Sequence, residues 1–304
     1  MTVVTPLAQR LVRHPTTARL AGPVLVRRRP TAEVVVAQMG KVGSQAVVAS
    51  LSQAGVRAAH VHFLDRASLR WADRVYRQNW NPRRLPWHVW EGRHAAARLR
   101  AGERLDIVTV AREPVGRNLS AFFQVADLQF GIDLGDFGTG AAGADLVRLR
   151  SAFLEEFDEH ERPLRWFDDE LKRSTGIDVY RHPFDRAKGY SIIGSDRARV
   201  LVLRTDRLDE TFTPAVHEFL GRPDVGLVNR NDSAAKDTGE LYEQVQHRLR
   251  LPATYLEQMY NSKYARHFWT PEELAQARAA WSEAWPEPRS GSSGARQAVA
   301  GAQA

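Results

Sequence analysis

Short apolar runs alternate with amphipathic segments along most of this chain of 304 residues. The apolar runs predict four buried strands, over residues 33–38, 56–64, 105–110 and 199–204. Because segments with helical periodicity separate these runs, the strands are expected to lie parallel in one sheet with helices on both faces. The hydrophobic pattern therefore predicts an α/β fold.

Turn and cap signals mark the ends of several helices. A helix over residues 45–54 is expected to stop at Gly55, and Pro114 suits the first turn of another helix. Three later segments also have helical character, and they span residues 145–174, 240–262 and 271–283. The last of them opens with the capping-box sequence Thr270-Pro271-Glu272-Glu273.

The two ends of the chain differ in composition from the part between them. Residues 1–32 contain six arginines and no acidic residue, which predicts a loosely packed basic arm. Residues 286–304 are rich in glycine, serine and alanine, which predicts a disordered tail. We expect one folded domain over residues 33–285.

Composition narrows the classes of function. Without cysteine there is no disulfide, thiol nucleophile or cysteine-ligated metal site. The apolar runs are too short to span a bilayer, so we expect a soluble, cytoplasmic protein, with contact between the basic arm and a membrane surface left open. The formal net charge of +7 favours an anionic ligand. The oligomeric state cannot be read from the sequence.

The first candidate site follows the first predicted strand, in Gln38-Met39-Gly40-Lys41-Val42-Gly43-Ser44-Gln45. A strand, a glycine-bearing turn and a helix in this order expose backbone N–H groups that can bind an anion, and Lys41 and Ser44 add a charge and a hydroxyl. The segment is not a Walker A loop, because its lysine precedes the second glycine. The alternative is an ordinary turn between a strand and a helix.

The second candidate site follows the third predicted strand. Arg112 stands just beyond the strand, and Ser120 lies two turns into the next helix. A guanidinium and a hydroxyl in these positions could hold one phosphate at the carboxyl edge of the sheet. The alternative is that Arg112 pairs with Glu113 and that Ser120 faces solvent.

Together the two motifs resemble those of the PAPS-dependent sulfotransferases. In that family a K-x-G-[ST] loop binds the 5′-phosphosulfate of PAPS, and an arginine and a serine eight residues apart bind its 3′-phosphate. Lys41-Val42-Gly43-Ser44 and the pair Arg112 and Ser120 are similar to these motifs. The segments 38–44, 112–123 and 260–264 look closest to the bacterial capsular polysaccharide synthesis branch, and the resemblance spans residues 33–275.

The resemblance implies a P-loop-like sulfotransferase fold, PAPS as the sulfuryl donor and 3′,5′-ADP as the product. It implies a set of residues that bind the donor: Lys41, Val42, Gly43, Ser44, Gln45, Arg112, Ser120 and Lys236. Lys236 is included because the family often places a basic loop over the 3′-phosphate, although it could equally be a surface lysine. Lys263, in the segment 261–264, could be structural.

A pair of histidines supplies the candidate base. Strand alternation places His60 and His62 on one face at the end of the second predicted strand. In heparan-type sulfotransferases a glutamate at the similar position acts as the base, so the resemblance assigns this role to His60, with His62 as the second candidate. The alternatives are hydrogen-bonded core histidines or a metal site with Asp65, and we expect no metal.

Two further segments could border the acceptor. Residues 71–90 hold four tryptophans interleaved with four arginines, which could form a platform for a sugar, or a helical excursion whose tryptophans pack on the core. Residues 131–143 contain five glycines and predict a mobile loop near the acceptor.

The sequence therefore predicts a sulfotransferase that transfers the sulfuryl group of PAPS to a hydroxyl of a small-molecule or glycan acceptor, such as a carbohydrate or a glycosylated metabolite or lipid. The nearest alternative is a nucleotide kinase, for which Asp65 would have to bind magnesium. A basic nucleic-acid-binding protein is a further alternative, but no nucleic-acid motif is recognised and a nucleic-acid partner is not expected.

Overall fold

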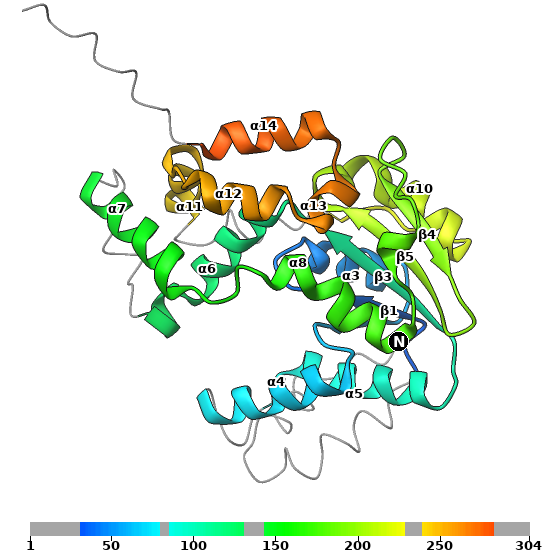
Figure 1. Cartoon of the computed structure of the whole chain (residues 1–304). Helices are drawn as coiled ribbons and strands as arrows, with labels where there is room; N and C mark the ends of the chain where they lie inside the picture. Colours follow the sequence, from blue (N-terminus) through cyan, green and yellow to red (C-terminus); the bar gives the residue numbers. More distant parts are fainter. Residues whose placement is uncertain (1–30, 80–84, 131–142, 229–238, 283–304) are drawn as a thin grey trace, which may run out of the picture.

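The computed structural model describes residues 31–79, 85–130, 143–228 and 239–282 (Figure 1). Its sheet has five strands in the order β2-β1-β3-β5-β4. The strands are β1 (Val34–Ala37), β2 (Ala58–Val61), β3 (Leu105–Ala111), β4 (Tyr190–Gly194) and β5 (Ala198–Arg204). The first three and β5 are parallel, and β4 runs antiparallel to β5.

The four predicted strands are confirmed, and the prediction of a wholly parallel sheet is wrong at one edge. β4 was not predicted, because only Tyr190 and Ile193 of its residues are buried and its alternation is weak. A short turn joins β4 to β5, with the Ser195 N–H donating to the Ala198 carbonyl. A connection this short allows only an antiparallel pair.

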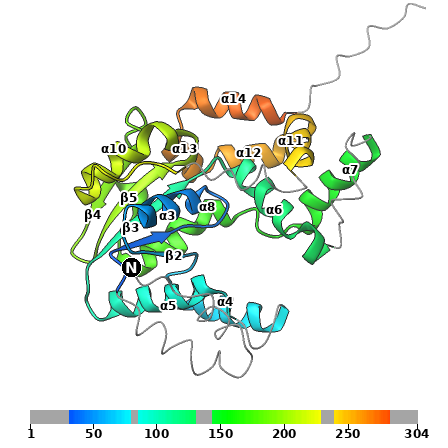
Figure 2. The same cartoon turned by 180° about the vertical axis from the view of Figure 1, so that it is seen from behind.

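Helices cover both faces of the sheet, and α3 and α8 lie on opposite sides (Figures 1 and 2). The helices in the first half are α3 (Ser44–Gln53), α4 (Arg66–Asn79), α5 (Trp87–Arg100), α6 (Pro114–Phe130) and α7 (Gly143–Ser151). Those in the second half are α8 (Arg162–Trp166), α9 (Arg173–Thr175), α10 (Leu208–Leu220), α11 (Gly239–Arg248), α12 (Ala253–Tyr260), α13 (Lys263–Phe268) and α14 (Pro271–Trp281).

Two of the three long helical predictions are broken in the structure. The stretch 145–174 contains π-helical turns at Ala152–Glu156 and Phe167–Lys172, and residues 157–161 between them are not helical. The stretch 240–262 is interrupted before Pro252, which caps α12. The capping box predicted for α14 is confirmed, since Thr270 and Glu273 exchange both of its hydrogen bonds.

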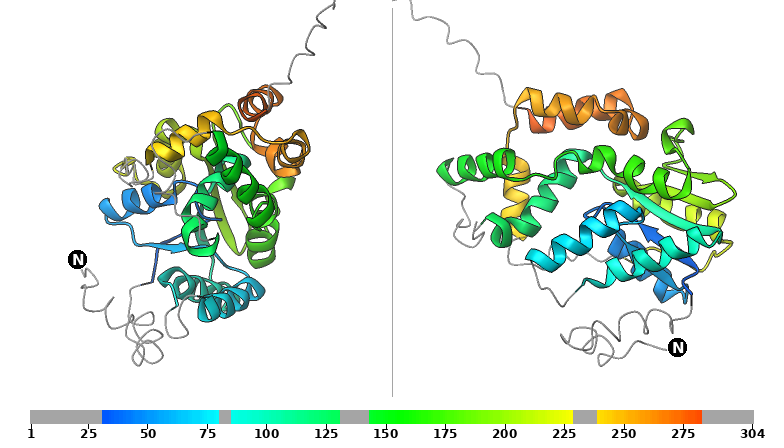
Figure 3. Two further views of the ribbon diagram at one scale, coloured as in Figure 1. Left: turned by 90° about the vertical axis from the view of Figure 1, so that its left-hand side faces the viewer. Right: turned by 60° about the horizontal axis from the view of Figure 1, so that its bottom comes forward.

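The apolar side chains form separate clusters. The main core packs α3, α10, α13 and the second π-helical turn against the sheet, and its central strands are buried on both faces. A second cluster joins α6, α7, α11, α12 and α14. A small third cluster lies within the hairpin of α4 and α5, which stands at the β2 edge far from α14 (Figure 3).

Within the residues that the structure describes, no helix is both long enough and apolar enough to cross a bilayer. The predicted basic arm, apart from residues 31 and 32, and the predicted tail lie outside the described residues.

Candidate functional site

The turn between β1 and α3, residues 38–43, is called the Lys41 loop from here on. Gly40 and Gly43 take left-handed backbone conformations with φ of 87° and 81°. Lys41 does so too, with φ of 62°, and no other non-glycine residue does in the part of the chain that the structure describes. A side chain in this region costs of order 1 kcal/mol, and such strain is concentrated at functional sites.

Arg117, in the first turn of α6, holds the start of the Lys41 loop. Its Nη2 donates to the Met39 carbonyl at 3.1 Å and its Nε to the Gly40 carbonyl at 3.4 Å. Nη2 also pairs with the Glu159 carboxylate at 3.2 Å. The side chain is only 2% exposed, and burial lowers the pKa of Arg117 to about 10, so the charge persists at neutral pH. These acceptors compensate a charge that would be costly to bury alone.

Arg112 joins the two sequence motifs directly. Its Nη1 donates to the Lys41 carbonyl at 2.8 Å, and its Nη2 donates to the Tyr242 hydroxyl at 3.2 Å. The buried Tyr264 hydroxyl fixes the backbone of Arg112, accepting from its N–H at 3.0 Å and donating to its carbonyl at 2.7 Å. The end of β3 and the start of α3 are therefore connected through one guanidinium.

Glu113 does not take up Arg112 in an ion pair. Its carboxylate accepts from the backbone N–H groups of Val115 and Gly116, at 2.8 and 2.7 Å, and from the Tyr260 hydroxyl at 2.7 Å. Burial raises the pKa of this carboxyl group, and the hydrogen bonds partly offset that increase. Glu113 therefore caps the start of α6.

Ser120 lies on the face of α6 over which Arg112 extends. A β-carbon added to Gly116 would stand 3.9 Å from Nη2 of Arg112, and Ser120 follows Gly116 by one helical turn. Phe123, three residues further on, packs against Tyr242 with the ring centroids 5.3 Å apart. The hydroxyl of the half-buried Ser120 makes no hydrogen bond to any residue that the structure describes.

The carbonyl groups and the N–H groups around the end of the Lys41 loop differ in their partners. The Thr205 hydroxyl lies 2.9 Å from the Val42 carbonyl, so the carbonyl groups of residues 39–42 are all engaged by side chains. The N–H groups of residues 42–45 find no acceptor within the described part of the chain. Because they also stand at the positive end of α3, they can hold an anion.

His60 borders this anion cradle, which we define as the N–H groups of residues 42–45 and the Ser44 hydroxyl. Its Nε2 lies 3.1 Å from Oγ of Ser44 and 2.8 Å from Nε2 of Gln38. Because the Gln38 side-chain oxygen accepts from the Gly40 N–H, its amide nitrogen must donate to His60. His60 is therefore neutral, with its proton on Nδ1, and burial lowers its pKa below the usual value.

His62 lies deeper. Its Nδ1 is 3.1 Å from the Gln38 carbonyl and 3.0 Å from the Gln38 amide nitrogen. Its ring is 4.5 Å from that of His88 on α5. Burial lowers the pKa of His62 well below its usual value, and the electrostatic interaction with the neighbouring imidazoles of His88 and His60 lowers it further. Of the two candidate bases, His60 is the one hydrogen-bonded to Ser44.

Asp65 serves as the cap of α4. Its carboxylate accepts from the N–H groups of Ala67 at 2.6 Å and of Ser68 at 3.3 Å. Within the described residues no group of three histidine, aspartate or glutamate side chains is placed to hold a metal ion. The Asp65 carboxylate, which a kinase would need to bind magnesium, is thus engaged with backbone N–H groups.

The remaining sequence candidates divide into two groups. Lys236, Trp80 and the segment 131–142 lie outside the described residues. Lys263 pairs with Asp168 at 2.5 Å on the surface, which is a structural contact. The described part of the segment 71–90 belongs to the hairpin of α4 and α5, where Trp71 stays 46% exposed.

The roles of several residues that build the site were not predicted from the sequence, although Gln38 stands in the first candidate segment. Gln38 is fully buried and links both histidines to the Lys41 loop, and Glu91 of α5 accepts from the His60 N–H at 2.7 Å. Arg117 and Thr205 hold the loop carbonyls. A polar residue at the end of a buried apolar strand is a signal that could have revealed Gln38. Nothing local marks Glu91 or Thr205.

Comparison with known proteins links the second half of the chain to a family. The model of the NKWYS family, described as "putative capsular polysaccharide synthesis protein", matches residues 155–270. No curated protein and no solved structure matches the chain. The matched stretch includes Glu159, Thr205, Tyr242 and Tyr264, and it excludes the Lys41 loop. The match supports an enzyme-like role in polysaccharide biosynthesis and does not specify the reaction.

Proposed function

We propose that this protein is a sulfotransferase that moves the sulfuryl group of PAPS to a hydroxyl of a carbohydrate or of a glycosylated metabolite or lipid. The observation that carries the proposal is the 2.8 Å hydrogen bond from Arg112 to the Lys41 carbonyl. It brings together the two motifs to which the sulfotransferase resemblance assigns the two ends of one donor molecule.

The anion cradle suits the 5′-phosphosulfate end. With the loop carbonyl groups held by Arg112, Arg117 and Thr205, the N–H groups of residues 42–45 present partial positive charge to a bound anion. The Ser44 hydroxyl stands among them, and Lys41 supplies a full positive charge in the same loop. Residues of this kind neutralise the charge that develops on a leaving phosphate oxygen.

Arg112 and Ser120 suit the 3′-phosphate end. Arg112 uses part of its guanidinium on the Lys41 carbonyl and on Tyr242, and its remaining N–H groups stay available for a phosphate. The hydroxyl of Ser120 lies on the same face of α6. Lys236, which we include as a third contact, lies outside the described residues.

His60 would act as the base. The acceptor hydroxyl gives its proton to Nε2 of His60, its oxygen forms a bond to sulfur, and the bond from sulfur to the bridging oxygen breaks. The electron pair of that bond leaves on the 5′-phosphate of 3′,5′-ADP. Gln38 and Ser44 occupy Nε2 in this structure, so an incoming hydroxyl takes the place of one of them. The neutral ring is the form that such a base requires.

The test is binding of 3′,5′-ADP, measured by calorimetry and by heat stabilisation beside Mg-ATP. We expect 3′,5′-ADP to bind and stabilise the protein and Mg-ATP to have no effect. Lys41→Ala should lose this binding and slow PAPS turnover, with a dextran oligosaccharide as acceptor, by about 10²- to 10³-fold.

Lys263→Ala is the matched control, because it removes a lysine that pairs with Asp168 on the surface. It should bind 3′,5′-ADP like the native protein. Stabilisation by Mg-ATP alone would identify a kinase. Salt-sensitive retention on DNA without any response to 3′,5′-ADP would identify a nucleic-acid-binding protein. A fully active Lys41→Ala variant would overturn the role of the loop.

A further inference from the structure

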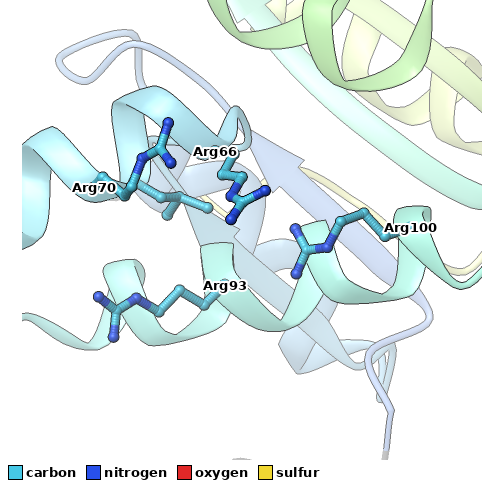
Figure 4. A pocket seen from close by; sticks show the side chains of 5 residues that line it. Arg66, Arg70, Arg93 and Arg100 are labelled. Carbon is cyan, nitrogen blue, oxygen red and sulfur yellow. The ribbon is translucent and has the colours of Figure 1, made fainter.

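Four arginines surround a cavity of about 340 Å³ in the hairpin of α4 and α5. We call this cavity the arginine pocket; Arg66, Arg70, Arg93, Arg100 and Leu69 line it. Figure 4 shows Arg66 and Arg100 extending toward each other from the two helices, with Arg70 and Arg93 further along. The function proposed above makes no use of this feature.

The regular spacing of the helices places these side chains together. Arg66 and Arg70 are one turn apart on α4, and Arg93 and Arg100 are two turns apart on α5, so each pair shares one face of its helix. Leu69 of α4, only 5% exposed, packs in the small cluster of the hairpin. The arginine pocket is therefore anchored on two packed helices.

The positive charge in the arginine pocket is largely uncompensated. The side chains of Arg66, Arg70 and Arg100 have no ion pair or hydrogen bond with any residue that the structure describes. Arg93 pairs with Asp73 at 3.1 Å, and Asp73 is shared with Arg77 at 2.8 Å. The seven residues that connect α4 to α5, residues 80–86, contain no acidic side chain. Repulsion between these like charges raises the free energy of the arginine pocket when no ligand is bound, and a bound anion removes that repulsion.

The side chains that line the arginine pocket limit the kinds of ligand that it can bind. Guanidinium groups bind sulfate, phosphate and carboxylate through paired hydrogen bonds, and several of them in one cavity suit a ligand with several anionic groups. Among the residues that the structure describes, the buried Leu69 is the only apolar one in the lining, and this part of the arginine pocket offers no aromatic face to a nucleobase and no exposed apolar side chain to a lipid. A hydrophilic, multiply charged ligand fits best.

The arginine pocket is separate from the histidine site. His88 and Glu91, which contact His62 and His60, lie in the first half of α5. Arg93 follows Glu91 by only two residues, but it points to the opposite side of α5, because successive helical residues are turned by about 100°. Arg100 points to the same side as Arg93 and ends the helix, about 14 Å beyond Glu91 along its axis at 1.5 Å per residue. A ligand here would therefore bind beside the transfer site and not within it.

We propose that the arginine pocket binds an anionic oligosaccharide, one that carries sulfate or carboxylate groups on successive sugars. The proposal does not depend on sulfuryl transfer, because it rests on charge and shape at the α4–α5 hairpin alone. Arginine stays charged at all physiological pH values, so binding should be insensitive to pH and should weaken as salt is added.

The experiment is calorimetry of the whole protein with a sulfated dextran oligosaccharide, with neutral dextran as the matched probe. We expect the sulfated form to bind and the neutral form not to bind. The variant Arg66→Gln/Arg70→Gln/Arg100→Gln should weaken binding about 100-fold or more, since loss of one charge-assisted contact commonly costs about tenfold. The single variant Arg100→Gln should weaken it about tenfold.

The control variant is Arg165→Gln/Arg173→Gln/Arg266→Gln, which removes the same charge from exposed positions elsewhere. It should change affinity less than about threefold, as expected of exposed charges. Equal losses in the two triple variants would overturn the proposal in favour of net charge alone. Binding to vesicles of phosphatidylglycerol but not to the oligosaccharide, lost in the pocket variant, would overturn it in favour of a membrane contact.

Failure of this proposal is distinguishable from failure of the proposed function. The pocket variants should bind 3′,5′-ADP like the native protein, and Lys41→Ala should bind the sulfated oligosaccharide like the native protein. Retained 3′,5′-ADP binding also shows that a pocket variant is folded. Loss of the oligosaccharide in Lys41→Ala would place its site at the Lys41 loop and overturn the arginine pocket.

Discussion

The Lys41 loop and the arginine pocket both gather arginine, and the guanidinium groups serve different ends in the two regions. Beside the loop, Arg117 is 2% exposed and donates to backbone carbonyl groups and to Glu159. In the pocket, Arg66, Arg70 and Arg100 are exposed and have no partner among the described residues. Arginine thus fixes the backbone of the Lys41 loop in one region, and in the arginine pocket its N–H donors remain available to a ligand.

The difference teaches how burial assigns these roles. A buried guanidinium needs acceptors in the folded chain, because an unpaired charge in the interior is strongly destabilising. Its donors are therefore engaged in fixing the Lys41 loop, and the loop N–H groups are left for the ligand that we propose. An exposed guanidinium stays hydrated without protein partners and can exchange that water for an anionic ligand.

The largest effect should come from removing the proposed base beside the Lys41 loop. His60→Ala is expected to slow PAPS turnover about 10²- to 10⁴-fold, the usual range for a general base. Burial lowers the pKa of His60, and protonation below that pKa removes the lone pair. Native turnover should therefore be level above pH 6.5 and fall under more acidic conditions.

The measurement is turnover against pH with a dextran oligosaccharide as acceptor, for His60→Ala and His62→Ala. The affinity of the arginine pocket for sulfated oligosaccharide should be unchanged in His60→Ala, which keeps the two regions distinct. If His62→Ala loses the larger share of activity and His60→Ala does not, the assignment of the base is wrong.

A smaller effect should separate the two kinds of arginine. Arg117→Met leaves buried carbonyl groups without donors, so we expect it to lower the free energy of unfolding by about 3 kcal/mol. Arg66→Met, the matched substitution in the arginine pocket, should change it by less than about 0.5 kcal/mol. Urea denaturation of both variants measures the difference, and similar losses would contradict the contrast between the two regions.

The smallest effect concerns charge repulsion within the arginine pocket. Arg66→Gln/Arg70→Gln/Arg100→Gln should raise the free energy of unfolding by a few tenths of a kcal/mol at low salt. The gain should vanish in about 1 M salt, where the Debye length falls to about 3 Å. A loss of more than about 1 kcal/mol in the same urea titration would mean that these arginines are structural.

Much of the fold and part of the candidate site could be predicted from local sequence. Buried parallel strands are short apolar runs, so β1, β3 and β5 were recognisable, whereas the half-exposed edge strand β4 was not. The glycines and the lysine of the Lys41 loop are adjacent in sequence, which made that turn visible. Arg117 and Thr205 act through contacts over long sequence separations, which no local pattern records.

The sequence by itself determined where the parallel strands and the glycine-bearing turn after β1 lie, because backbone preference and hydrophobic period are local properties. It also determined the sign of the charge and the absence of cysteine chemistry. Only the tertiary structure decided that Arg112 reaches the Lys41 carbonyl, that His60 and not His62 lies against Ser44, and which arginines keep open donors. These outcomes depend on packing between distant elements, and packing decides which polar groups find partners and which stay available to a ligand.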